Sequence, residues 1–297
     1  MFNDLPTSVT SDGGTDKKGN SFYRKVRQEG YGRIEDWKES ARMLNAYRIR
    51  LEARSVAMLR TLDNGLDRIV IGWLILAGLA SALRVVPFSM NSTVSVAEVL
   101  PYFVVVLAPA VSIVLALRWF ADADRLAQPQ LRLARLGRWE CVSVAEAKRH
   151  ALYGTSGIML SLLVGTLLNV PVRAAEYLAA MPPVGGFAPT WLATLHFAMT
   201  LDVVLFTSLY AIAFVAALRR VPLFPRLLLA IWIGDVAMQL VTAHMVTSTH
   251  VPANVAAALQ DLLTGNVKKV LISMALWLPY LLLSARVNVT YRHRVAA

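Results

Sequence analysis

A single carboxylate interrupts the apolar stretch FPRLLLAIWIGDVAMQLVTAHMV, which runs from Phe224 to Val246. The stretch is close to the roughly 20 residues that an α-helix needs to cross a bilayer. Asp235 lies near its middle, and would therefore lie near the bilayer midplane. Because a charge at that depth is costly in contact with lipid, the stretch predicts a membrane helix with one polar side turned toward protein.

The composition of the whole chain is that of a membrane protein. Hydrophobic residues make up 56% and charged residues 16%, whereas soluble domains carry about 25% charged residues. The formal net charge is +11. A basic chain can bind nucleic acid, but these Lys and Arg residues lie mainly outside the apolar runs, in the terminal segments and loops, as they do in membrane proteins. We therefore expect membrane lipids as partners, and no nucleic acid.

Six apolar runs predict an all-α, polytopic membrane helix bundle. They lie at residues 69–88, 99–117, 155–178, 191–218, 224–246 and 267–285. Ser-x-x-Glu capping boxes at Ser95 and Ser143 predict a helix start before the second run and an amphipathic helix ahead of the third. Residues 250–266 predict a separate short amphipathic helix on the outer surface.

The positive charges predict the orientation of the bundle. Of the 30 Lys and Arg residues, 26 lie in the two terminal segments and in alternate loops, all on one side of the predicted membrane. The loops on the other side hold only Lys268 and Lys269. Since cytoplasmic loops are enriched in Lys and Arg, we expect both termini in the cytoplasm. No apolar run precedes Ile69, so we expect no cleavable signal peptide.

The segments outside the membrane are polar or amphipathic. Residues 1–33 predict a disordered cytoplasmic tail. Residues 34–67 predict a cytoplasmic amphipathic helix, which would lie on lipid headgroups, bind a protein partner or simply extend the first membrane helix. Arginines alternate with leucines in residues 131–139, which suits either a membrane surface or an ordinary basic loop.

Three short motifs carry a resemblance to a known family. GWLIL begins at Gly72, FPRL begins at Phe224, and WLPYLLLSARVNVTY runs from Trp277 to Tyr291. They resemble a family of small bacterial inner-membrane proteins called domain of unknown function two-five-six-nine. The residues that carry the resemblance are Gly72, Trp73, Pro225, Arg226, Trp277, Pro279, Tyr280, Ser284, Arg286 and Thr290.

Members of that family are shorter and look four-helical. Relative to them, this chain has two further helices between Phe88 and Trp191, and an N-terminal extension. The resemblance implies a location in the bacterial inner membrane, and it gives no reaction.

Polar residues of several predicted helices fall at similar depth in the outer half of the bilayer. They are Arg84, Asn169, Arg173, Glu176, Asp202, Asp235 and Gln239. Two guanidiniums, of Arg84 and Arg173, are available to balance the carboxylates of Asp202 and Asp235. We predict that both aspartates face the bundle, and that at least one of them lies near Arg84 or Arg173.

Two interpretations of this polar layer stay open. It is either a buried ion network that holds the helices in register or a hydrated pocket that binds a small solute or relays protons. The first suits a non-catalytic accessory or scaffold protein of the bacterial envelope, which is the function we predict. The second suits a small-solute or proton-coupled transporter, which is the alternative.

One motif raises the possibility of an enzyme. Gly154–Gly157 reads GTSG and matches the GxSG of rhomboid intramembrane proteases. However, the charge rule puts Ser156 near the inner face, and His196 and His244 near the outer face, about 25 Å away at helical rise. The chain has one cysteine, Cys141, and no metal-binding or nucleotide-binding motif. We therefore predict no catalytic site, no metal and no cofactor.

Overall fold

The computed structural model describes residues 42–43, 45–47, 49–89, 95–129, 137–184, 188–249 and 251–297. The chain divides into two units, residues 1–54 and residues 55–297. In the first unit, the described residues from 42 to 54 are helical. The predicted tail, residues 1–33, lies outside the described residues, as does much of the predicted amphipathic helix, including residues 34–41.

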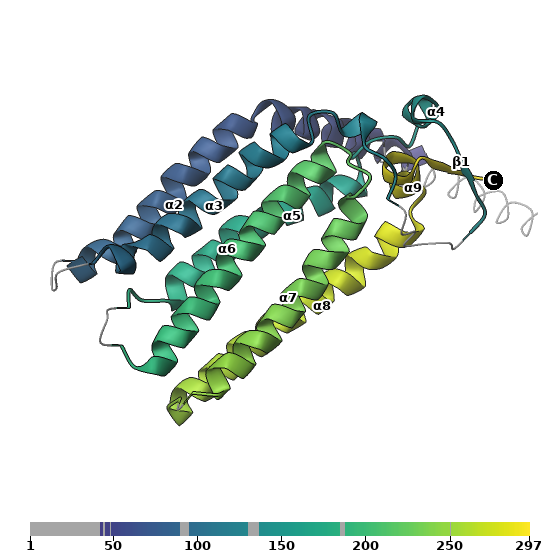
Figure 1. Cartoon of the computed structure of the whole chain (residues 1–297). Helices are drawn as coiled ribbons and strands as arrows, with labels where there is room; N and C mark the ends of the chain where they lie inside the picture. The colour runs from purple at the N-terminus through teal and green to yellow at the C-terminus, as the bar shows by residue number, and fades with distance from the viewer. Residues whose placement is uncertain are drawn as a thin grey trace, which may run out of the picture. The chain divides into compact units, whose positions relative to one another are not determined.

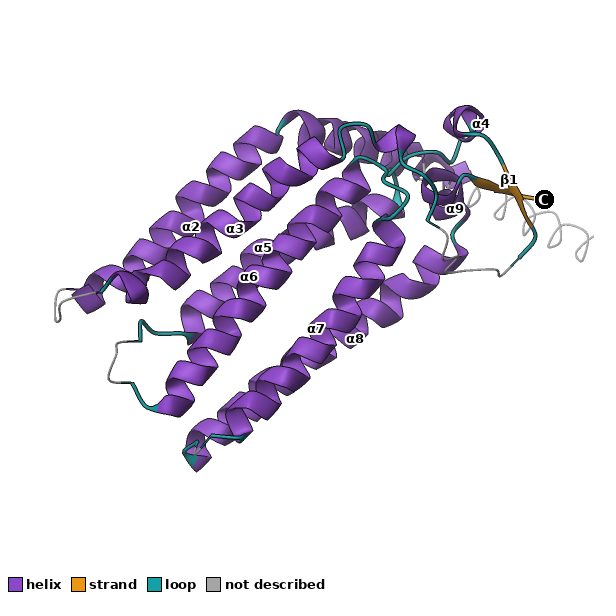
Figure 2. Cartoon of the chain, in the orientation of Figure 1, coloured by secondary structure: helices purple, strands orange, loops and turns teal. Residues whose placement is uncertain are grey.

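Six helices of the second unit are long and apolar enough to cross a membrane, as predicted. They are α2 (Leu66–Ser89), α3 (Val96–Trp119), α5 (Ile158–Ala180), α6 (Thr190–Leu218), α7 (Phe224–Thr247) and α8 (Ala253–Leu283). Figure 1 shows them running alongside one another, and Figure 2 shows that the second unit is almost wholly helical. The chain is therefore an α-helical, multi-pass membrane protein.

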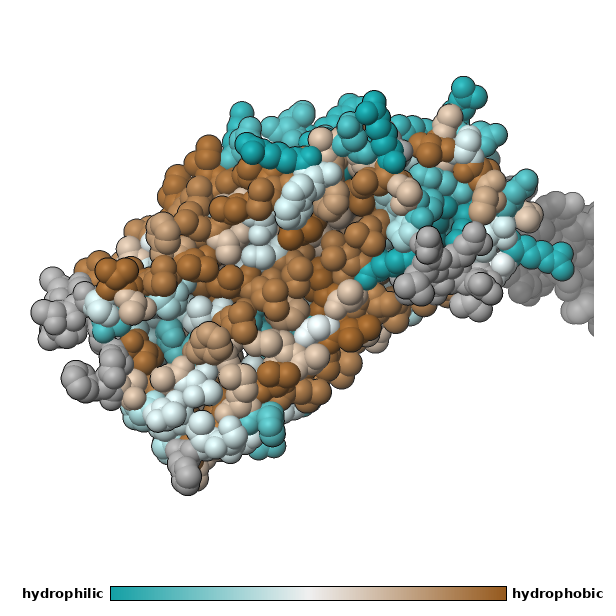
Figure 3. All heavy atoms as spheres, viewed as in Figure 1, coloured by the Kyte–Doolittle hydropathy of each residue, from teal (hydrophilic) through white to brown (hydrophobic). Residues whose placement is uncertain are grey.

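The central helix of the bundle is α6, which contacts α3, α5 and α7. Its second half is rich in alanine, and Ala211, Ala213, Ala216 and Ala217 are completely buried. Small side chains let neighbouring helices approach closely, which is the main source of packing energy between helices in lipid. The helices at the periphery, α2 and α8, instead expose leucine and isoleucine, and Figure 3 shows apolar residues along the helices.

The two predicted capping boxes are confirmed. In α4 (Val144–Arg149), the backbone N–H of Glu146 donates to Ser143 Oγ at 3.2 Å, and the N–H of Ser143 donates to Glu146 Oε2 at 2.8 Å. The Ser143 hydroxyl also donates to Glu146 Oε2 at 2.8 Å, and the hydrogen bonds that this carboxylate accepts from the N–H and the hydroxyl of Ser143 lower the pKa of Glu146. At the start of α3, the N–H of Ser95 donates to Glu98 Oε2 at 3.3 Å.

The prediction of a separate surface helix over residues 250–266 is wrong. Residues 253–266 belong to α8, which starts at Ala253 and continues without interruption to Leu283. At 1.5 Å per residue, its 31 residues span about 46 Å, which is longer than the hydrocarbon core. The predicted sixth span starts at residue 267, whereas α8 starts well before it, and within this longer helix Lys269 binds Glu176 of α5.

The C-terminal segment forms structure that the sequence did not predict. Ser284 is non-helical and ends α8, and the short helix α9 (Ala285–Arg292) follows it. Strand β2 (Arg294–Ala296) then pairs antiparallel with β1 (Trp139–Cys141), with Trp139 opposite Ala296. A 3₁₀ turn, η1 (Ala123–Arg125), completes the described elements. The end of the second unit that holds α4, α9 and both strands is called the α9 end below (Figure 1).

Candidate functional site

Three helices bring their charged residues into direct contact. Arg173 of α5 donates through Nη2 to both carboxylate oxygens of Asp235 on α7, at 2.7 and 2.8 Å. Its Nη1 donates to Asp202 Oδ2 on α6 at 3.2 Å. The side chains are 12%, 1% and 6% exposed, respectively. The prediction that the two aspartates face the bundle beside Arg84 or Arg173 is therefore confirmed for Arg173.

Neutral groups complete this buried ion network. Gln239 donates through Nε2 to Asp202 Oδ1 at 3.0 Å and also lies 3.5 Å from Asp235 Oδ1. Tyr210 donates its hydroxyl to Asp235 Oδ2 at 3.3 Å. The ring of Phe206 lies 4.9 Å from the guanidinium carbon of Arg173, a cation–π contact. Every charged group in the network is thus in contact with at least two partners.

The helical repeat explains why these residues converge. On α7, Asp235 and Gln239 are four residues apart, so they lie one turn apart on the same face. On α6, Asp202, Phe206 and Tyr210 follow the same spacing and form one stripe. The two polar stripes face each other because charged side chains at this depth are costly in contact with lipid, so they turn toward protein.

Arg84 does not belong to the network. Its Nε donates to the carbonyl oxygen of Met181 at 3.3 Å, just beyond the end of α5, and the hydroxyl of Tyr102 donates to the same oxygen at 3.1 Å. The prediction of two guanidiniums balancing two carboxylates is therefore wrong. The carbonyl of Met181 has no partner inside the helix it follows, and an arginine on α2 is long enough to reach it.

The network has an excess of negative charge when both aspartates are ionised. One guanidinium, that of Arg173, serves the carboxylates of Asp202 and Asp235. Gln239 and Tyr210 donate hydrogen bonds but add no positive charge. An unbalanced charge in a low-dielectric interior is costly, so the network favours taking up a cation or a proton.

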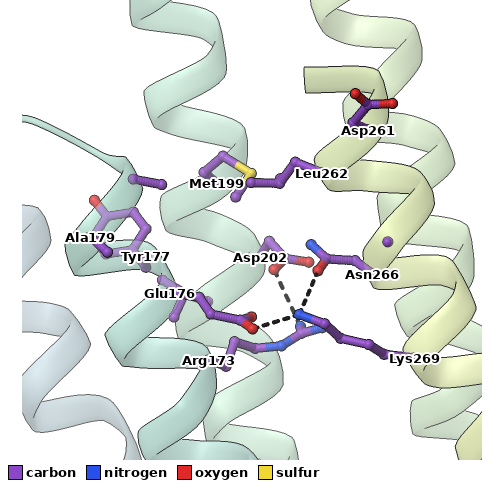
Figure 4. Close-up of a pocket in the computed structure, with 13 residues that line it drawn as sticks. Arg173, Glu176, Tyr177, Ala179, Met199, Asp202, Asp261, Leu262, Asn266 and Lys269 are labelled. Carbon is purple, nitrogen blue, oxygen red and sulfur yellow. Dashed lines mark hydrogen bonds and ion pairs between the residues drawn. The ribbon is translucent and has the colours of Figure 1, made fainter. Parts of the chain in front are cut away.

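A cavity of about 510 Å³ lies beside the network, between α5, α6 and α8. Figure 4 shows Arg173 and Asp202 on one side of it, and Asn266 and Lys269 of α8 on the other. Its ionisable lining residues are Arg173, Glu176, Asp202, Asp261 and Lys269. Three carboxylates and two cations thus line the cavity, and Asp235, behind Arg173, adds a fourth carboxylate.

A chain of polar side chains connects the exposed rim of the cavity with the buried network. At the rim, Lys269 Nζ lies 2.5 Å from Glu176 Oε1. Lys269 also lies 3.5 Å from Asn266 Oδ1, and Asn266 donates through Nδ2 to Gln239 Oε1 at 3.4 Å. Gln239 in turn contacts both aspartates. Polar side chains therefore connect the rim of the cavity with both aspartates.

The structure separates one further residue from the predicted layer and adds several that were missed. Asn169 is half-buried on α5 and makes no side-chain hydrogen bond within the described part of the chain. Asn266, Lys269 and Asp261 were missed because their segment was assigned to the outer surface. Tyr210 was missed because a tyrosine in an apolar helix gives no signal of its own, although its spacing from Asp202 does.

The family-like motif residues lie outside the cavity and hold the bundle together. Trp73 donates through Nε1 to the carbonyl of Val106 at 2.8 Å. The hydroxyl of Thr290 accepts a hydrogen bond from the N–H of Gly154 at 3.0 Å and donates one to the carbonyl of Gly154 at 3.3 Å. The rings of Trp277 and Tyr280 form an edge-to-face pair. Pro279 is exposed on α8. Ser284 lies at the break between α8 and α9. These contacts agree with a structural role for the motif. Gly72 and Pro225 lie within α2 and α7.

In the GTSG motif, the hydroxyl of Ser156 is bound by an arginine. Ser156 Oγ accepts a hydrogen bond from Arg286 Nη1 at 2.6 Å. A guanidinium is always protonated and is not a general base, so this contact does not activate the serine as a nucleophile. The described residues likewise contain no group of three His, Cys, Asp or Glu residues that could hold a metal ion.

Comparisons of the chain with protein-family models, with curated proteins and with solved structures give no match. The chemistry of the site therefore rests on its own geometry. That geometry consists of a buried arginine shared by two aspartates, beside a cavity that charged and apolar residues line together.

Proposed function

We propose that this protein is a membrane carrier that takes a small cationic solute, such as an amine, into the cavity between α5, α6 and α8. One observation supports this proposal above the others. Asp202 lines the open cavity, yet the only guanidinium that contacts it within the described residues is shared with Asp235. A cation that enters the cavity would be attracted to Asp202.

The same arrangement suits coupling to protons. A carboxylate that shares its only counter-ion with a second carboxylate is stabilised by binding either a proton or a solute cation. The proton and the solute cation cannot be bound at the same time. Carboxylates inside membrane proteins commonly serve as proton relays for this reason. Exchange of one solute cation for one proton at Asp202 would couple solute movement to a pH gradient.

The distribution of charge supports an orientation. The α9 end carries most of the basic residues of the described loops, and positive loops stay in the cytoplasm. We place the α9 end and both termini in the cytoplasm, and the cavity in the outer half of the bilayer. The resemblance of the motifs to a bacterial inner-membrane family supports the inner membrane as the location.

The charge preference of the cavity provides the first test. Asn266→Cys in a Cys141→Ser background puts a single thiol in the cavity without changing its charge. Cationic and anionic methanethiosulfonates, which do not cross membranes, are then added from outside. We expect the ratio of cationic to anionic reaction rates to be higher than at Ser248→Cys, an exposed position at the end of α7. Equal ratios, or no reaction at position 266, would contradict the proposal.

Transport itself is measured in liposomes that contain the purified protein. Labelled primary and quaternary amines are tested beside carboxylic acids of similar size, with an imposed pH gradient. We expect uptake of an amine that is lost in Asp202→Asn and kept in Asp122→Asn, which alters an exposed carboxylate outside the bundle. Uptake of acids instead of amines, or uptake that survives Asp202→Asn, would count against the proposal.

The accessory or scaffold role is a second candidate, supported by the first unit of the chain. Its helical residues expose apolar side chains, among them Met43, Tyr47, Ile49 and Leu51. An exposed apolar face on a helix binds a protein partner or a lipid surface. Affinity purification of the full chain and of a Tyr47→Asp variant tests this role. A partner that is lost with the substitution would favour the scaffold, and identical sets of proteins would not.

A further inference from the structure

The α9 end gathers three arginines from three different elements. Arg226 lies in the first turn of α7, Arg292 is the last residue of α9, and Arg294 is the first residue of β2. None of them belongs to the cavity described above, which lies between α5, α6 and α8. They form a second charged site on the molecule.

Several contacts hold these elements beside one another. The ring of Phe224, at the start of α7, packs against the ring of Tyr291 on α9, with centroids 5.1 Å apart. Gln128 donates to the carbonyl of Tyr291 at 3.2 Å and contacts His293 Nδ1 at 3.1 Å. Arg226 donates through Nη2 to the carbonyl of Pro129, the residue after Gln128, at 3.3 Å. Arg226 therefore lies close to the chain from Tyr291 onward.

Arg292 is only partly satisfied in this position. Its side chain is buried, and the residue is 5% exposed. Its Nη1 donates to two neutral acceptors, the carbonyl of Leu282 at 3.3 Å and Asn288 Oδ1 at 2.9 Å. Its Nη2 is buried, and no hydrogen-bond acceptor for it lies among the described residues. Buried guanidiniums are normally paired with an anion, because an uncompensated buried charge is strongly unfavourable.

The surroundings of Arg292 make the local charge more positive. Burial is the largest cause that lowers the pKa of Arg292 to about 10, and the positive charges of Arg294 and Arg226 contribute to the same shift. The N-terminus of α7, where Arg226 lies, adds the positive end of a helix dipole. A cation at that end of a helix is unfavourable, whereas an anion there is favourable.

We propose that Arg226, Arg292 and Arg294 form a binding site for a phosphate-type oxyanion. The planar fork of a guanidinium matches the oxygens of a phosphate group better than a lysine does. Arg226 and Arg294 are half-buried and reach the surface, while Arg292 lies beneath them. The phosphate belongs either to the headgroup of an anionic lipid or to a soluble phosphate compound.

Thermal unfolding of the full chain in a neutral detergent tests whether the site binds soluble phosphate. Inorganic phosphate is titrated at constant ionic strength, with chloride as the replaced anion, so that general screening is held equal. We expect saturable stabilisation by phosphate, with apparent affinity about tenfold weaker in Arg226→Gln or Arg294→Gln, the loss of one charge-assisted hydrogen bond. The control is Arg125→Gln, an exposed arginine of the same end that pairs with Asp122.

The lipid source is tested with the same variants in lipid nanodiscs. Discs of phosphatidylcholine alone are compared with discs that also contain phosphatidylglycerol, and the melting temperature of each variant is recorded. Stabilisation by phosphatidylglycerol but not by inorganic phosphate identifies a lipid headgroup, and stabilisation by inorganic phosphate identifies a site open to soluble phosphates. Both results support an oxyanion site, provided that Arg226→Gln and Arg294→Gln reduce the effect and Arg125→Gln does not.

The proposal is overturned if phosphate stabilises the protein no more than chloride does, and if discs with phosphatidylglycerol stabilise it no more than discs of phosphatidylcholine alone. It is equally overturned if Arg226→Gln and Arg294→Gln respond as Arg125→Gln does. Arg292→Gln removes a buried side chain that also binds Leu282 and Asn288. The decision therefore rests on the two half-buried arginines, whose replacement leaves those contacts in place.

Discussion

Arg173 binds both carboxylate oxygens of Asp235 through a single nitrogen, Nη2, at 2.7 and 2.8 Å. Its other terminal nitrogen, Nη1, reaches Asp202 at 3.2 Å. The guanidinium is thus the common counter-ion of two carboxylates that come from different helices. Each aspartate is stabilised by Arg173 and destabilised by the other aspartate, so changes at these three positions are expected to be strongly coupled.

Replacing the common cation should be more damaging than replacing one of the anions. Arg173→Gln leaves two buried carboxylates without a cation, and we expect a loss of stability of about 3–5 kcal/mol. Asp235→Asn leaves Arg173 paired one-to-one with Asp202, so the loss should be smaller. Thermal unfolding of the two variants in the same detergent compares them. A larger loss in Asp235→Asn than in Arg173→Gln would show that the charge balance described above is wrong.

Asp202→Asn should separate function from stability. The substitution removes the excess negative charge while an amide keeps the shape of the side chain, so the melting temperature should stay equal or rise. The preference of Asn266→Cys for the cationic reagent over the anionic one should fall toward the ratio at Ser248→Cys. A preserved preference would mean that Asp202 does not set the potential of the cavity.

Arg84→Met tests whether Arg84, on α2, binds only the carbonyl beyond the end of α5 and has no influence on the cavity. The variant loses the hydrogen bond to the carbonyl of Met181, which is also bound by Tyr102, so we expect a loss of about 1 kcal/mol. Because Arg84 does not contact either aspartate, the reagent preference at position 266 should not change. A clear shift in that preference would place Arg84 in the electrostatic environment of the cavity after all.

The pair between Glu176 and Lys269 should contribute little to stability. Both side chains are about half exposed, at 47% and 62%, and exposed ion pairs are worth about 0–1 kcal/mol. A double-mutant cycle with Glu176→Gln and Lys269→Gln measures the coupling energy by thermal unfolding. Lys269→Gln alone removes a positive charge from the rim, so it should increase the preference of Asn266→Cys for the cationic reagent. A decrease would be inconsistent with the cavity as described.

The capping box of α4 should weaken in acid. The hydrogen bonds from Ser143 lower the pKa of Glu146 in the folded protein, so its contribution to helix stability is present above the unfolded pKa and is lost as the pH falls through the folded value. Hydrogen exchange of the Ser143 amide, compared between the native chain and Glu146→Gln, reports this loss. We expect extra protection in the native chain at neutral pH, and none at the acid end of the titration. Equal protection at neutral pH would contradict the cap.

The polar stripes were predictable, and their partners were not. Asp235 and Gln239 lie one turn apart whatever the rest of the chain does, so the sequence identifies the face of α7 that avoids lipid. Whether Arg84 or Arg173 neutralises that face depends on the rotation and tilt of α2 and α5. Those quantities follow from contacts between distant residues, such as the bond from Arg84 to Met181, and leave no local pattern.

The same distinction holds for the α9 end. The sequence located Arg226 and Arg286 within recognisable motifs, but the pairing of β1 with β2 joins segments that are far apart in the chain. Each strand has only three residues, too few for an alternating pattern to stand out. The neighbourhood of Arg226, Arg292 and Arg294 therefore became visible only when the chain was folded.

The sequence by itself determined that this chain crosses a membrane six times, and which faces of its helices are polar. Hydrophobic length and helical period are local properties, and the bilayer sets the same requirement for every span. The tertiary structure alone decided that α8 is continuous, that Asn266 and Lys269 of α8 complete the cavity, and that one arginine serves two aspartates. These features depend on how helices rotate against one another, which side-chain packing over the whole bundle settles.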